Sequence, residues 1–186
     1  MALLTTPVCD FGKKADNFNL NGVDSRKWSL EDCKGEKGLL VMFICNHCPY
    51  VQALIEKLAV ETAVLAKKGI GCVAINPNDY ISFPEDSFDN MIIESKKHGF
   101  SFPYLLDESQ EVAKKYGAIC TPDFYGYNSQ LELQYRGRFD DRGAKNVMDA
   151  NQSDLFKAMM LIARTGKGPE EQIPSIGCSI KWRNKN

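Results

Sequence analysis

An unbroken apolar segment that ends in two cysteines is the most constraining feature of the sequence. Residues 38–44 read Gly-Leu-Leu-Val-Met-Phe-Ile, and the motif Cys45-Asn-His-Cys48 follows directly. A run of this length, rich in branched and aromatic side chains, predicts a strand that is buried on both faces of a sheet. Beyond the motif, apolar residues recur at helical spacing from about Pro49 to Lys68. The two cysteines therefore lie where a central strand passes into a long helix.

Length and composition exclude several classes of protein. The 186 residues suffice for one domain with a substantial core, and we expect a single domain over 1–186 with 167–186 as a C-terminal tail. A formal net charge of −1 without a large basic block argues against nucleic acid as a partner. No stretch approaches the ~20 apolar residues of a membrane helix, and the N-terminus lacks the basic region of a secretory signal. We expect a cytoplasmic protein without a membrane partner, either a monomer or a weak homo-oligomer.

The cysteine count alone says little about the Cys-x-x-Cys motif. Seven cysteines cannot all pair, and the same number placed at random gives roughly 0.2 pairs at this spacing. A zinc site would need a second Cys or His pair at metal-binding spacing, which the sequence does not contain. We therefore expect neither a metal nor a cofactor. A zinc half-site and two inert core cysteines nevertheless stay open as alternatives.

The order of predicted elements indicates an α/β fold, a central mixed sheet with helices on both faces. An N-terminal hairpin is expected to turn at Asn21-Gly22, and the tail should pack on the domain because its apolar residues alternate with polar ones. Strands are predicted at 39–44, 70–76, 101–106, 123–127 and 131–135. Helices are predicted at 49–68, at 85–98, at 108–116 and from Ser153 to Gly166, with a surface loop at 137–150.

The position of the pair predicts its chemistry. The N-terminal end of a helix stabilises a thiolate, and we expect Cys45, as the more exposed thiol, to be the attacking residue. Cys48, one turn further on, would resolve a mixed disulfide. When protonated, His47 would favour the thiolate at Cys45, although it could instead be a solvated residue at the helix end. Pro49 fits the first helical turn, where a missing N–H costs nothing.

A second group of residues, Cys120-Thr121-Pro122, precedes the predicted hairpin at 123–135. A proline that enters a strand suggests an unusual bond geometry, such as a cis peptide. Cys120 lies two residues before this proline, and Cys178 lies in the apolar tail. Each is either an additional redox thiol or a packed core residue, and we favour packing for both.

These features together resemble the thioredoxin superfamily, in particular its redoxin branch of peroxiredoxin-like proteins and thiol–disulfide reductases. The resemblance covers nearly the whole chain and is closest to small bacterial thioredoxin-like proteins that carry a Cys-Asn-His-Cys-Pro motif. It rests on the motif at 43–51, the Asn-x-Asn-Asp-Tyr loop at 76–80, the segment 102–107 and the tail 176–182. The resemblance implies a thioredoxin-like fold, a cis Thr121-Pro122 bond that faces the cysteine pair, and thiol–disulfide exchange. Asn46, Pro49 and Thr121 would then border the substrate groove.

Two departures limit what the resemblance implies. Thioredoxin-type enzymes carry a buried carboxylate six residues before the first cysteine, where this chain has Leu39. Peroxiredoxins carry Thr and Pro at fixed positions before the reactive cysteine, and both are absent before Cys45. A His before the second cysteine is similar to the oxidising members of the superfamily.

The sequence therefore predicts a thiol–disulfide oxidoreductase with Cys45, Cys48, His47 and Pro122 at its site. Its partners would be protein disulfides or thioredoxin-type reductants. The alternatives are a redoxin-type thiol peroxidase and a non-catalytic module that binds a metal or a partner.

Overall fold

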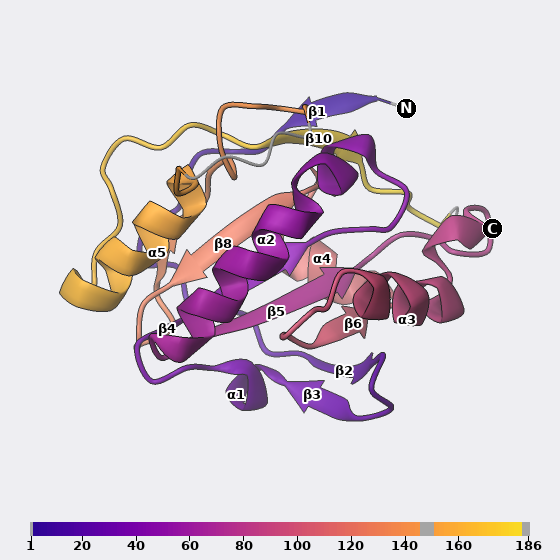
Figure 1. The fold of residues 1–186 in the computed structure, drawn as a ribbon, viewed down its shortest axis with the longest axis horizontal. Coiled ribbons are helices and arrows are strands. Elements are labelled where there is room, and N and C mark those ends of the chain that lie inside the picture. Colours follow the sequence, from indigo (N-terminus) through magenta and orange to yellow (C-terminus); the bar gives the residue numbers. More distant parts are fainter. Residues whose placement is uncertain (1, 146–150, 184–186) are drawn as a thin grey trace.

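A computed structural model describes residues 2–145 and 151–183, and its centre is a mixed sheet between two layers of helices (Figure 1). The strands of this sheet are β2 (Asn19–Gly22), β3 (Lys27–Ser29), β4 (Gly38–Phe43), β5 (Ile70–Asn76), β6 (Tyr104–Leu106), β8 (Asp123–Tyr127) and β9 (Leu133–Tyr135). Within the described residues their order is β3-β2-β6-β5-β4-β8-β9. Because β4 pairs in parallel with β5 and antiparallel with β8, the predicted mixed α/β architecture is confirmed.

The helices divide between the two faces of this sheet. Their bounds are α1 (Leu30–Cys33), α2 (Pro49–Lys67), the 3-10 helix η1 (Pro84–Asp86), α3 (Phe88–Lys97), α4 (Glu111–Tyr116) and α5 (Asp154–Thr165). Apolar side chains of α2, α3 and α5 share one buried cluster, and those of α1 and α4 share the other. Figure 1 shows α2 lying across the middle of the sheet. None of the described helices is long and apolar enough to cross a bilayer.

Strand β4 explains why the cysteine motif has a fixed position. All six of its residues are buried. Leu40 and Met42 pack into the cluster with α2 and α5, whereas Val41 and Phe43 pack into the cluster with α1 and α4. A strand enclosed on both faces cannot slip by one residue without exchanging its two faces. The end of β4, and the loop that follows it, are therefore held in place by both cores.

The C-terminal segment adds a second, smaller sheet beside the main one. Strand β10 (Ile176–Ser179) lies between β1 (Leu3–Thr5) and β7 (Cys120–Thr121), and both pairings are antiparallel. Further along, Asn78 accepts a hydrogen bond from the backbone N–H of Lys181 at 2.9 Å, and the Gln110 amide donates to the carbonyl of Lys181 at 2.8 Å. The prediction that the tail packs on the domain is confirmed for its described residues.

Three details differ from the sequence-based expectation. The N-terminal hairpin does not turn at Asn21-Gly22, because these residues pair with Leu106 and Leu105 of β6, and the turn follows at 23–26. Strand β1 was not predicted, since it depends on pairing with the distant β10. The helix expected at 85–98 is divided into η1 and α3, and Ser87 caps the second part. Of the expected loop at 137–150, residues 146–150 lie outside the described part of the chain.

Candidate active site

The predicted cysteine pair lies in the short loop between β4 and α2. Cys48 is the N-cap of α2 and Pro49 is the first helical residue. Both thiols are buried, with exposed fractions of 2% for Cys45 and 0% for Cys48. The pair is thus enclosed by protein at the point where the central strand meets the long helix.

The Thr121-Pro122 peptide is cis, as predicted, and Thr121 contacts both sulfur atoms. The Thr121 hydroxyl lies 3.3 Å from the Sγ of Cys45. The Sγ of Cys48 lies 3.1 Å from the Thr121 carbonyl oxygen, to which it donates when protonated. A segment more than 70 residues away in the sequence therefore encloses the pair from the side of β7.

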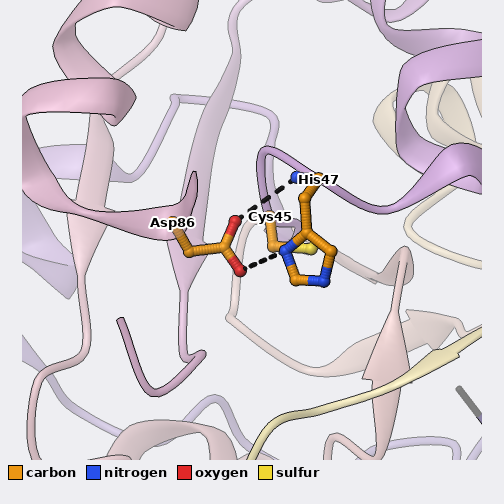
Figure 2. A group of neighbouring side chains, drawn as sticks. All are labelled: Cys45, His47 and Asp86. Carbon is orange, nitrogen blue, oxygen red and sulfur yellow. Dashed lines mark hydrogen bonds and ion pairs between the residues drawn. The ribbon is translucent and has the colours of Figure 1, made fainter. Parts of the chain in front are cut away.

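A buried carboxylate that was not predicted as a site residue lies beside the pair. Asp86 is fully buried at the end of η1. Its Oδ1 accepts the backbone N–H groups of Asn46 at 2.8 Å and His47 at 3.3 Å. Its Oδ2 accepts His47 Nδ1 at 2.7 Å and the Asn78 amide at 2.7 Å. Figure 2 shows the carboxylate hydrogen-bonded to both the backbone and the ring of His47, with Cys45 behind the ring.

This contact determines the state of His47. The hydrogen bond from Nδ1 to Asp86 raises the pKa of His47, against the effects of partial burial and of the nearby Lys181 charge. The imidazole also stacks on Phe83, with the ring centroids 5.6 Å apart. The ring is therefore fixed in orientation, with Nδ1 committed to the carboxylate.

The two thiols have different pKa values, and the lower one belongs to Cys48 rather than Cys45. The pKa of Cys48 is lowered to about 5, because the Cys45 thiol hydrogen-bonds to its sulfur and the N–H groups of Cys178 and Val51 assist. The pKa of Cys45 is raised by its hydrogen bond to Cys48, by burial and by the charge of Asp86. The lower pKa thus belongs to Cys48, whereas the sequence analysis expected the helix end to favour a thiolate on Cys45. The helix begins at Pro49, so its unpaired N–H groups lie next to Cys48.

Hydrogen bonds of Asn46 hold the loop between β4 and α2 in place, and Asn46 does not line the groove beside Pro122. Its side-chain amide donates to the Glu85 carbonyl at 2.9 Å, and its side-chain oxygen accepts the Tyr104 hydroxyl at 2.9 Å. Its backbone carbonyl accepts the Gln52 amide. Asn46 also lines a small pocket together with Cys45, so its expected position at a substrate groove stays a prediction.

A groove lies beside Pro122, between α2 and the segment that leads into β10. Its apolar side chains come from Tyr50, Leu54, Phe139, Ile173 and Ile176. Pro49 is exposed at the start of α2.

The two remaining candidate thiols have different surroundings. Cys120 is buried with its thiol 3.9 Å from the Pro122 carbonyl, and burial raises its pKa. Cys178 lies opposite Thr121 in the ladder between β10 and β7, and it contributes to lowering the pKa of Cys48. The ladder thus places Cys178 beside the peptide unit that contacts the pair.

Among the described residues, one group has the composition of a metal site. Ligand atoms of Cys45, His47 and Asp86 all lie within 4.8 Å of one another. Both carboxylate oxygens of Asp86, however, already accept two hydrogen bonds each. A metal would have to displace these donors, so the geometry fits an ion pair that orients His47 better than a metal centre.

Sequence reasoning missed Asp86 because its local pattern indicates only the start of a helix. An acidic residue in a first turn is ordinary, and Asp86 lies about 40 residues from the cysteine pair. The available hint was the apolar Leu39, which stands where related enzymes carry a buried carboxylate. In this structure the buried carboxylate beside the pair is Asp86, at the end of η1.

Comparison with known proteins places the chain among the redoxins. The model of the AhpC/TSA family matches residues 11–140. Two solved structures match nearly the whole chain. An uncharacterized conserved protein from Geobacillus kaustophilus is 41% identical, with a TM-score of 0.93 over 100% of this chain and 99% of that one. A hypothetical protein, SMc02350 from Sinorhizobium meliloti 1021, is 40% identical, with a TM-score of 0.89 over 97% of this chain and 98% of that one.

More distant matches include named oxidoreductases. The thiol-disulfide oxidoreductase ResA of Bacillus thuringiensis subsp. konkukian is 28% identical over 120 residues, and the match spans only 61% of either chain. A secreted disulfide oxidoreductase of Mycobacterium tuberculosis is 17% identical, with a TM-score of 0.53 over 63% of this chain and 80% of that one. The second likeness concerns the fold alone. The predicted thioredoxin-like fold is therefore confirmed.

Proposed function

The chain belongs to the AhpC/TSA family, and we propose that it is a thiol–disulfide oxidoreductase that exchanges disulfides with partner proteins through Cys45 and Cys48. One observation carries the proposal: both sulfur atoms are held against Thr121, beside the cis-proline, at the start of α2. The ResA proteins that match part of the chain bear the name of the same activity.

Reduction of a partner begins at Cys45. Cys45 is the more exposed of the two cysteines. When it attacks, its proton passes to the neighbouring sulfur of Cys48. The Cys45 sulfur then bonds to one sulfur of the partner disulfide, and the other partner sulfur leaves as a thiolate. Cys48 then attacks the Cys45 sulfur, and its proton passes to the second partner sulfur as the mixed disulfide breaks. The partner leaves as a dithiol, and a Cys45–Cys48 disulfide remains. The reverse sequence oxidises a partner.

His47 and Asp86 supply the proton chemistry that the missing acid at position 39 would provide. The imidazolium, stabilised by Asp86, gives its proton to the departing partner thiolate and recovers it in the reverse direction. Asp86 holds Nδ1 and the backbone of the same residue, so the ring presents its other nitrogen in one orientation. Asp86 is thus a positioning residue, and His47 the acid and base.

A mixed disulfide trapped on Cys45 would test this order of events. Cys48→Ser protein treated with oxidised glutathione should retain one glutathione on Cys45, because the resolving thiol is missing. The Cys45→Ser protein should retain none at position 48, which is fully buried. Peptide mass mapping after alkylation locates the adduct. Glutathione bound to Cys48 in preference to Cys45, or to neither, would overturn the proposal.

Membership in the family also raises a second candidate function, a thiol peroxidase. The residues before Cys45 oppose it, because the Thr and Pro that peroxiredoxins carry there are absent from this chain. Stopped-flow mixing with hydrogen peroxide decides between the two. Rapid formation of a sulfenic acid at Cys45 would favour the peroxidase, and an inert thiol would exclude it.

A further inference from the structure

The tail strand β10 brings a third thiol to the cysteine pair. Cys178 lies directly opposite Thr121 in the antiparallel ladder between β10 and β7. The carbonyl of the same Thr121 accepts the Cys48 thiol at 3.1 Å. Because Cα atoms of paired residues in such a ladder are about 5 Å apart, Cys178 and Cys48 border the same peptide unit.

Cys48 is the middle member of the three thiols. Both the Cys45 thiol and Cys178, through its thiol and its backbone N–H, lower the pKa of Cys48. All three side chains belong to one buried cluster. Cys178 is the most accessible of them, with an exposed fraction of 6% against 2% for Cys45 and 0% for Cys48. This order places Cys48 where it can form a disulfide in either direction.

We propose that Cys178 is a third redox thiol, which exchanges with Cys45 for the disulfide to Cys48. The inference rests on the proposed function, which supplies the Cys45–Cys48 disulfide. The Cys178 thiolate attacks the sulfur of Cys48, the new Cys178–Cys48 bond forms, and the Cys48–Cys45 bond breaks. Cys45 leaves as a thiolate and takes up the proton that Cys178 gave up. No electrons enter or leave, so no further oxidant or reductant is needed.

The exchange frees Cys45 and moves the disulfide to β10. After the step, Cys45 is again a thiol beside Thr121, and the disulfide includes the more accessible Cys178. Ser175 and Ile176, which line the groove beside Pro122, lie close to Cys178 in the chain. A reductant that enters this groove can therefore attack the disulfide at Cys178.

Cys120 provides the comparison, because it is also buried and lies next to Thr121 in the same strand. Successive side chains in a strand point to opposite faces. Thr121 points its hydroxyl at Cys45, so the side chain of Cys120 leaves β7 on the other face. Its thiol lies near the carbonyl of Pro122. Cys120 should therefore not take part in the exchange.

Disulfide mapping in a Cys45→Ser background tests the inference. After oxidation with diamide and alkylation of the remaining thiols, peptide mass mapping should find a Cys48–Cys178 bridge. The bridge should be lost in Cys45→Ser/Cys178→Ser and retained in Cys45→Ser/Cys120→Ser. In the wild type, isolated Cys45–Cys48 disulfide incubated without oxidant should lose part of that bridge to Cys48–Cys178.

The two possible failures differ. If the wild type forms Cys45–Cys48 but both experiments find Cys178 fully alkylated, the third thiol is refuted and the proposed function stands. If the oxidised wild type contains no Cys45–Cys48 bridge, the proposed function itself fails. The wild-type experiment needs no substitution, so misfolding of a variant cannot obscure the result.

Discussion

Replacing Asp86 with asparagine should both destabilise the fold and release His47. The carboxylate accepts four hydrogen bonds, two on each oxygen. An amide has one acceptor oxygen, so Asp86→Asn can keep the two backbone N–H donors of the loop but not the donors on Oδ2. Those are Nδ1 of His47 and the amide of Asn78, each at 2.7 Å.

The magnitude follows from these two bonds. A hydrogen bond to a charged group contributes about 1.5 kcal/mol at the lower end of its range, so losing two costs about 3 kcal/mol of unfolding free energy. For a chain of this length, a loss of 1 kcal/mol lowers the melting temperature by about 2–4 °C. Asp86→Asn should therefore melt about 6–12 °C below the wild type. The pKa of His47 should fall, because the bond to Asp86 is the main cause of its elevation.

Urea unfolding and NMR titration of the imidazoles measure the two effects separately. The chain has two histidines, so the resonance of His98 is an internal reference for that of His47. Glu85→Gln is the matched control, since it removes one negative charge near His47 from an exposed side chain. An Asp86→Asn protein that unfolds within about 0.5 kcal/mol of this control, with the wild-type pKa at His47, would refute the reasoning.

Two further predictions concern pH and a buried ion pair. Because the pKa of His47 is raised above its usual 6.5, the stability from its ion pair with Asp86 is complete below about pH 6.5 and is lost as pH rises through the folded-state pKa. In urea unfolding from pH 5.5 to 9, the unfolding free energy of the wild type should therefore exceed that of Asp86→Asn by less and less. A difference that grows with pH would contradict this sign. Arg136→Ala should cost about 3–5 kcal/mol, because it leaves the fully buried Asp123 without its partner at 2.8 Å. Arg138→Ala, which breaks a partly exposed pair, should cost less than about 1 kcal/mol, and equal losses for the two arginine variants would contradict the role of burial.

The central part of the fold was predictable because its signals are local and consistent. The apolar run of β4 and the helical spacing of α2 each span several residues, and both elements formed where the sequence predicts them. The Cys-x-x-Cys motif lies between these two elements, so its position followed from theirs. The cis bond before Pro122 was expected from the position of a proline at the start of a strand and from the resemblance.

The features that escaped prediction depend on contacts between distant segments. Asn21-Gly22 has the composition of a turn, but pairing with β6 keeps both residues in a strand. Asp86 is indistinguishable in the sequence from any acidic residue at the start of a helix, and only the folded chain aims it at His47. The unequal pKa values of the two thiols follow mainly from their contact with each other, and also from Asp86 near Cys45 and Cys178 near Cys48. Asp86 and Cys178 come from segments that are distant in the sequence.

Equilibration in dithiothreitol redox buffers, followed by acid quenching, alkylation in denaturant and peptide mass mapping, tests the central claim most directly. If the protein exchanges disulfides through its cysteine pair, Cys48 should pass from fully alkylated to fully protected in one reversible two-electron transition, with Cys45 as its principal partner. Persistent alkylation of both Cys45 and Cys48 in the most oxidising buffer, in protein that stays folded, would contradict the claim.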